Sequence, residues 1–181
     1  MMNYTPTKSS ANGEAGRTAH RPRWAEIPIP LKWLIPAVGV GIFLLIALPV
    51  AMVIGRDGFL RDSVIANDPH LDPRYLEFAL TASIIYAVVL HAIDVVLSIW
   101  FVVKIMQGRQ WARIALSAYL VIATFGSLYS AAAGSAYLWA VIPGDSIHVI
   151  MLVLLWAPRS VRDFFARYKA RGMRTAMQDS P

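Results

Sequence analysis

Residues 78–103 read FALTASIIYAVVLHAIDVVLSIWFVV, a run in which His91 and Asp94 are the only charged or imidazole side chains. About 20 consecutive apolar residues are enough for a helix to cross the hydrocarbon core of a bilayer. The run is continuous rather than alternating, and a helix satisfies its own backbone polar groups in lipid. The segment therefore predicts a membrane-spanning helix.

Three further stretches have the same length and character. They cover residues 34–54, 114–133 and 137–157. The last contains Pro143-Gly144-Asp145-Ser146, so we expect a crossing helix with a break near Pro143. The alternative is a turn on the outer side, followed by a short helix. The fold class predicted is an all-α integral membrane protein with a four-helix transmembrane bundle over residues 31–158.

Composition supports this prediction and excludes other classes of protein. Apolar residues make up 57% of the 181 residues and charged residues only 15%, where a soluble domain has about a quarter charged residues. A disordered chain and an ordinary soluble enzyme are both excluded. The chain has no cysteine, which excludes disulfides, thiol catalysis, thiolate metal sites and iron–sulfur clusters.

The distribution of basic residues predicts the orientation. Only three of the 17 lysines and arginines, Arg56, Arg61 and Arg74, lie between the first two spans, where they accompany several aspartates. The others lie before the first span, between the second and third, or after the fourth. Because cytoplasmic segments carry the excess of Lys and Arg, both termini are expected in the cytoplasm, at the plasma membrane. The net charge of +6 is then a topology signal, and we expect no nucleic-acid partner.

The two tails differ in character. Residues 1–30 form a polar tail that we expect to be largely disordered. Residues 159–181 form a basic tail in which Val161, Phe164, Phe165 and Tyr168 share one helical face. We expect a cytoplasmic amphipathic helix on anionic lipid headgroups, whose membrane-surface residues are Arg162, Phe164, Phe165, Arg167, Tyr168 and Lys169. The alternative is a docking surface for a protein partner.

Ionisable residues inside spans are candidates for function, because they are expensive to place in lipid. His91 and Asp94 are three residues apart on the second span, and Asp145 and His148 are three apart on the fourth, so each pair shares a helix face. Three interpretations remain open. The pairs are hydrogen-bonded structural elements, or a proton or ion relay, or ligands of a metal or haem.

The third span carries small residues at a spacing of four. One row contains Gly126, Ser130 and Gly134, and the other contains Ala123, Ser127 and Ala131. Such rows let helix backbones approach closely. We expect them to pack within the bundle or to form an interface with another protein.

Two short elements resemble a known family. The first is Gly108-Arg109-Gln110-Trp111-Ala112-Arg113-Ile114, and the second is Leu154-Leu155-Trp156-Ala157-Pro158-Arg159-Ser160. Both resemble elements of small four-span membrane proteins of actinobacteria. The resemblance covers residues 34–168 and implies the architecture, but no particular activity.

These observations favour a non-catalytic function. We expect an accessory or scaffold subunit, bound to a larger membrane complex or to itself, with no cofactor and no catalytic residue. The alternative is a small transporter or a proton- or ion-translocating oligomer that uses His91, Asp94, Asp145 and His148. A second alternative is a haem- or metal-binding membrane protein that uses the same histidines.

Overall fold

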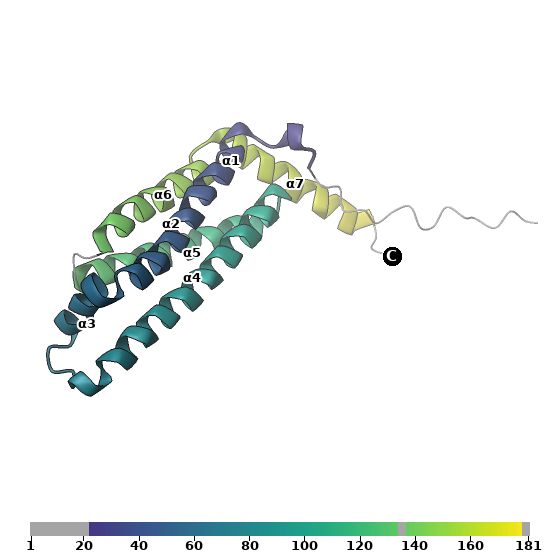
Figure 1. The fold of residues 1–181 in the computed structure, drawn as a ribbon. Coiled ribbons are helices and arrows are strands. Elements are labelled where there is room, and N and C mark those ends of the chain that lie inside the picture. The colour runs from purple at the N-terminus through teal and green to yellow at the C-terminus, as the bar shows by residue number, and fades with distance from the viewer. Residues whose placement is uncertain (1–21, 134–136, 179–181) are drawn as a thin grey trace, which may run out of the picture.

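The computed structural model describes residues 22–133 and 137–178, and these are almost entirely helical, with no strand. Four long helices form the body of the molecule: α2 (Leu34–Ile54), α4 (Leu76–Met106), α5 (Gln110–Ala133) and α6 (Leu138–Trp156). They alternate in direction along the chain (Figure 1). Each packs against two of the others, because α2 and α5 both contact α4 and α6. All four are long and apolar enough to cross a membrane.

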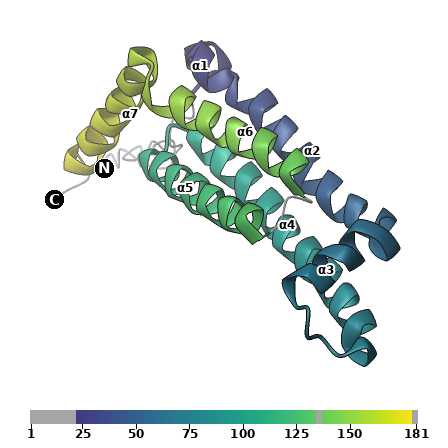
Figure 2. The same ribbon diagram turned by 90° about the vertical axis from the view of Figure 1, so that its left-hand side faces the viewer.

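Shorter elements lie at the two ends of these helices. One end carries a turn at Trp24–Glu26, α1 (Ile29–Lys32) and α7 (Arg159–Gln178). The other end carries a kinked turn, η2 (Arg56–Leu60), followed by α3 (Arg61–Asn67) and a short turn, η3 (Pro73–Tyr75). Figure 2 shows α7 crossing one end of the bundle and α3 lying at the other.

The predicted spans agree with these helices, with corrections at their boundaries. The stretch 34–54 is α2 itself, whereas α4 and α5 each extend beyond the predicted limits. The break expected near Pro143 is wrong, because α6 runs as one helix from Leu138 to Trp156 with Pro143 inside it. Asp145 therefore lies within a helix and not in an outer turn. The predicted disordered tail falls mostly on residues 1–21, which lie outside the described residues.

Two apolar clusters hold the bundle together, one toward each end. The larger cluster joins α1, α2, α4, α5, α6 and α7, and its fully buried members include Leu31, Leu34, Ile105, Leu116, Leu155 and Phe164. The smaller cluster, at the end that carries α3, contains Met52, Leu60, Leu76, Leu80 and Ala87. Burying a Leu, Ile, Phe or Met side chain contributes about 1.5–3 kcal/mol where water is the alternative environment. Between the two clusters, the middle of the bundle contains polar side chains.

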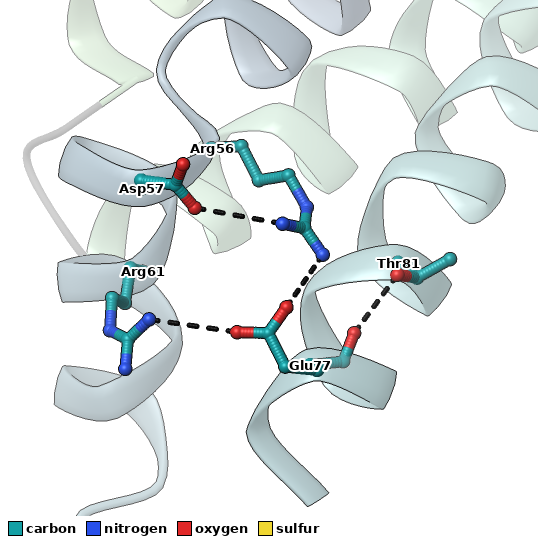
Figure 3. A network of polar contacts seen from close by, with 5 residues as sticks. All are labelled: Arg56, Asp57, Arg61, Glu77 and Thr81. Carbon is teal, nitrogen blue, oxygen red and sulfur yellow. Dashed lines mark hydrogen bonds and ion pairs between the residues drawn. The ribbon is translucent and has the colours of Figure 1, made fainter.

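At the end that carries α3, ion pairs connect η2 and α3 to α4 (Figure 3). Arg56 donates to the Glu77 carboxylate at 2.7 Å, and Arg61 approaches the other oxygen of the same carboxylate at 3.6 Å. Nearby, Asp72 accepts hydrogen bonds from the side chain and the backbone N–H of Arg74, and these two contacts hold the pKa of the Asp72 carboxyl below its ordinary value. Arg56 and Arg61 thus tie the segment between α2 and α4 to the first turn of α4.

At the other end, α7 packs onto the bundle through the face that we expected on lipid. Val161, Phe164 and Phe165 are buried in the larger apolar cluster, and the Tyr168 hydroxyl donates to Glu26 at 2.7 Å. The prediction that Phe164 and Phe165 contact the membrane surface is therefore wrong. Both rings belong to the larger apolar cluster, together with residues of α1, α5 and α6. The basic side chains of this helix, Arg162, Arg167 and Lys169, are exposed.

Candidate functional site in the core of the bundle

Polar side chains from three helices meet in the middle of the bundle, between the two apolar clusters. We call this set the polar layer. It consists of Asp94 and Ser98 on α4, Tyr119, Thr124 and Ser127 on α5, and Asp145 and His148 on α6. Asp145 and His148 lie near the midpoint of α6, so the layer is as far as possible from both ends of that helix.

The best-defined part of the layer joins α5 to α6. The Ser127 hydroxyl donates to Oδ1 of Asp145 at 2.6 Å, and Thr124 Oγ1 is hydrogen-bonded to Nδ1 of His148 at 3.0 Å. The same imidazole nitrogen lies 3.6 Å from Asp145 Oδ1, with side-chain exposures of 22% for His148 and 17% for Asp145. Oδ2 of Asp145 is buried and has no hydrogen-bond partner among the described residues. One carboxylate oxygen is thus held and the other is unpaired.

The second part of the layer joins α4 to α5. The Tyr119 side chain interacts with the Asp94 carboxylate and with Ser98, which is itself buried. Asp94 also lies close enough to His148 for an electrostatic interaction between α4 and α6. The structure therefore brings three of the four predicted polar residues, Asp94, Asp145 and His148, into one layer.

His91, the fourth predicted residue, is placed differently. Its Nδ1–H donates to the carbonyl oxygen of Ala87, four residues earlier in α4, at 2.7 Å. One of the two ring nitrogens of His91 is thus bonded within its own helix. Among the described residues, no group of three His, Asp or Glu side chains is arranged to hold a metal ion.

The charge of the layer depends on how many protons it holds. With two protons shared among Asp94, Asp145 and His148, the layer is neutral: either His148 is charged beside one carboxylate, or both acids are protonated. Adding or removing one proton leaves a net charge in a desolvated site, which is costly.

The two rows of small residues lie on different faces of α5. Ser127 faces the bundle, where it bonds Asp145, and Ala123 is half-buried with it. Gly126 and Ser130 are exposed, and no side chain lies within 4 Å of the position that a Cβ on Gly126 would occupy. Gly134, the last residue of this row, lies outside the described residues. The inner row serves packing in the bundle, and the outer row is left uncovered by this chain.

Sequence reasoning missed two members of the layer, Tyr119 and Thr124. Both carried a signal, because each is a polar side chain in an otherwise apolar stretch of α5, and Thr124 lies three residues before Ser127. That spacing places the two hydroxyls on one helix face. Which helix this face meets depends on the packing of the bundle.

Comparisons with family models, with curated proteins and with solved structures find no match to this chain.

Proposed function

We propose that the chain is an integral protein of the plasma membrane that crosses it four times, with both termini in the cytoplasm. Large apolar side chains on the outward faces of the bundle support this, including Phe43, Ile46, Phe78, Ile122, Phe125 and Val153, all of them exposed. Exposing these apolar side chains to water would be unfavourable, whereas exposing them to lipid is not.

The charges at the two ends support the proposed orientation. Lys32, Lys104, Arg109 and Arg159 lie at the end that carries α1 and α7, because α2 and α5 begin there and α4 and α6 finish there. The acidic residues of α3 and its neighbours lie at the opposite end. The basic end is expected in the cytoplasm.

The absence of cysteine makes this orientation simple to test. Ala66→Cys on α3 and Ala166→Cys on α7 place single thiols on exposed positions at opposite ends. In intact cells, a membrane-impermeant maleimide should label the Ala66→Cys variant, and should label the Ala166→Cys variant only after permeabilisation. The reverse pattern would refute the orientation, and equal labelling of both in intact cells would refute the crossing.

For the activity, we infer that the polar layer binds and releases a proton and that the protein conducts protons across the membrane. The observation that carries this inference is the meeting of Asp94, Asp145 and His148 at mid-bundle, with one Asp145 oxygen unpaired. Hydroxyl groups alone would suffice to hold helices together, at about 0.6 kcal/mol for a typical bond. Two carboxylates and an imidazole cost more to bury and add the ability to exchange protons.

The test is proton flux into liposomes that contain the purified chain. A potassium gradient with valinomycin drives protons inward, and an entrapped pH-sensitive dye reports them. We expect flux above that of protein-free liposomes, and its loss in Asp145→Asn, which keeps the bond to Ser127 but cannot ionise. Asp62→Asn, an exposed aspartate on α3, is the matched control and should behave as the wild type.

Each outcome of this test has a defined meaning. Flux at the wild-type level in Asp145→Asn would refute the proton-binding role, as would a wild type no faster than empty liposomes. The variant must elute as the wild type in gel filtration and keep its helical circular dichroism, so that loss of flux is not loss of fold.

A second candidate function, a non-catalytic accessory or scaffold subunit, is favoured by the outer row of α5. Gly126 and Ser130 are exposed, and each follows an exposed aromatic residue, Phe125 or Tyr129; a row of small residues allows close approach of another helix. Purification from the native membrane in mild detergent, followed by intact-mass measurement, tests this. A larger membrane protein in fixed stoichiometry would support the accessory role, and its loss in Gly126→Leu would assign the surface. A homo-oligomer or monomer would refute attachment to a larger complex.

A further inference from the structure

A buried arginine lies where α5, α6 and α7 meet. Arg113, in the first turn of α5, is only 4% exposed. Its guanidinium lies 3.8 Å from the centre of the Trp156 ring, at the end of α6, and 5.1 Å from that of Phe165, on α7. The Trp156 ring is fixed in turn, because its Nε1–H donates to Ser117 at 2.7 Å. Aromatic rings therefore contact the guanidinium from two helices.

Two of the three nitrogens of this guanidinium have no acceptor among the described residues. Nε and Nη2 of Arg113 are buried without a hydrogen-bond partner, and no ion pair joins Arg113 to any residue that the structure describes. A buried guanidinium without a counter-charge carries a large desolvation penalty that ring contacts offset only in part. An anion placed at these nitrogens would lower that penalty.

The surroundings also favour an anion. Arg162 on α7 is exposed and close enough to repel Arg113 electrostatically. The first turn of α5 contains no acidic residue, so the positive end of the helix dipole is also uncompensated there. Two arginines and a helix N-terminus thus add their positive potential at one place.

We propose that Arg113, with Arg162, binds the phosphate of a phospholipid headgroup in the cytoplasmic leaflet. The in-plane N–H groups of arginine match phosphate oxygens in geometry, and the two rings contact the guanidinium while Nε and Nη2 stay without an acceptor. Arg113 is the fourth residue of α5, at the depth where headgroups begin, and Trp156 beside it is 44% exposed, as an interfacial aromatic would be. This inference rests on the membrane placement proposed above, but not on the proton-linked activity.

The test is thermal unfolding of the full chain in detergent micelles with added lipid. Ligands that bind the folded state raise the unfolding temperature as their concentration rises above the dissociation constant. Phosphatidylglycerol should stabilise the wild type, whereas diacylglycerol with the same acyl chains, which lacks the phosphate, should not. Inorganic phosphate at millimolar concentration is the third probe, and it should have no comparable effect.

Variants then assign the site. Arg113→Gln should weaken phosphatidylglycerol binding by about tenfold or more, the effect expected for a charge-assisted hydrogen bond. Arg109→Gln, an exposed arginine four residues earlier, is the matched control and should bind as the wild type. Arg162→Gln, at an exposed position that should not disturb folding, should weaken binding to a smaller but measurable extent.

Several results would overturn the proposal. Unchanged binding in Arg113→Gln would do so, and if that variant does not fold, unchanged binding in Arg162→Gln would. An equal effect of inorganic phosphate would reassign the site to a free anion, and an equal effect of diacylglycerol would remove the role of phosphate. Asp145→Asn should still bind the lipid, so a failed lipid experiment and a failed flux experiment are distinguishable.

Discussion

Replacing Gly108 with alanine should destabilise the protein through a single, local conflict. Gly108 lies in the turn between α4 and α5 and has a φ of 75°, the only positive φ among the described residues. A Cβ there would also lie 3.0 Å from Cγ of the Tyr168 ring on α7. Glycine is therefore required both by the backbone conformation and by the packing of α7.

The magnitude follows from these two terms. The left-handed conformation costs an L-residue about 1–2 kcal/mol. The Tyr168 ring must also move, although it packs 4.8 Å from Phe164 between ring centres and donates to Glu26, and loosening such an aromatic contact costs about 0.5–1.5 kcal/mol. We expect Gly108→Ala to lower the free energy of unfolding by about 2–3 kcal/mol. Unfolding of the purified chain by sodium dodecyl sulfate in mixed micelles, followed by far-ultraviolet circular dichroism, measures this.

Two comparisons separate the terms. Gly126→Ala, where the new methyl group meets no atom within 4 Å, should be neutral or stabilising by up to about 1 kcal/mol, since it removes only backbone freedom. In a Tyr168→Ala background, Gly108→Ala should cost about 1 kcal/mol less than in the wild type, because the ring is no longer there. Equal costs in both backgrounds would refute the role of the ring, and a loss no larger than that of Gly126→Ala would refute the whole argument.

Three further predictions concern other parts of the chain. Asp72→Asn should be less stable than the wild type at pH values above the ordinary carboxyl pKa, because the pKa of Asp72 is lowered in the folded state. The difference in stability should vanish as the pH falls through that lowered pKa, and a difference that grows in acid would contradict this. Pro143→Ala should stabilise by about 1–3 kcal/mol, since the carbonyl four residues earlier regains a donor within α6; destabilisation would show that the proline is needed for packing. Glu77→Gln should lower the free energy of unfolding by about 0.5–1 kcal/mol in low salt, because it removes the charged partner of Arg56 and Arg61. This loss should shrink in about 1 M salt, and a loss that does not depend on salt would refute its origin in the ion pairs.

The helical architecture was predictable, because it depends on local features of the chain. The apolar runs of 78–103 and 34–54 fix helices wherever they lie, since their length and continuity leave no other way to satisfy the backbone in lipid. Pro143 shows the limit of local reasoning. Its missing N–H suggests a break, but the helix continues through it from Leu138 to Trp156.

The candidate site was predictable in its residue types and only partly in its membership. Asp94, Asp145 and His148 were recognisable because ionisable groups are rare in such runs. His91 could not be distinguished from these three residues by sequence, yet its imidazole is bonded to the backbone of its own helix and it is not a member of the polar layer. Tyr119 and Thr124 join it from α5, at a register that no local pattern specifies.

By itself, then, the sequence determined that the four apolar stretches are helices and that basic residues collect at one end of them. Only the tertiary structure decided which faces meet. It placed Phe164 and Phe165 in the core of the bundle, and it brought the Arg113 guanidinium against the rings of Trp156 and Phe165. The physical reason is that a segment's helicity and hydropathy are properties of adjacent residues, whereas burial and ion pairing depend on contacts between helices distant in sequence.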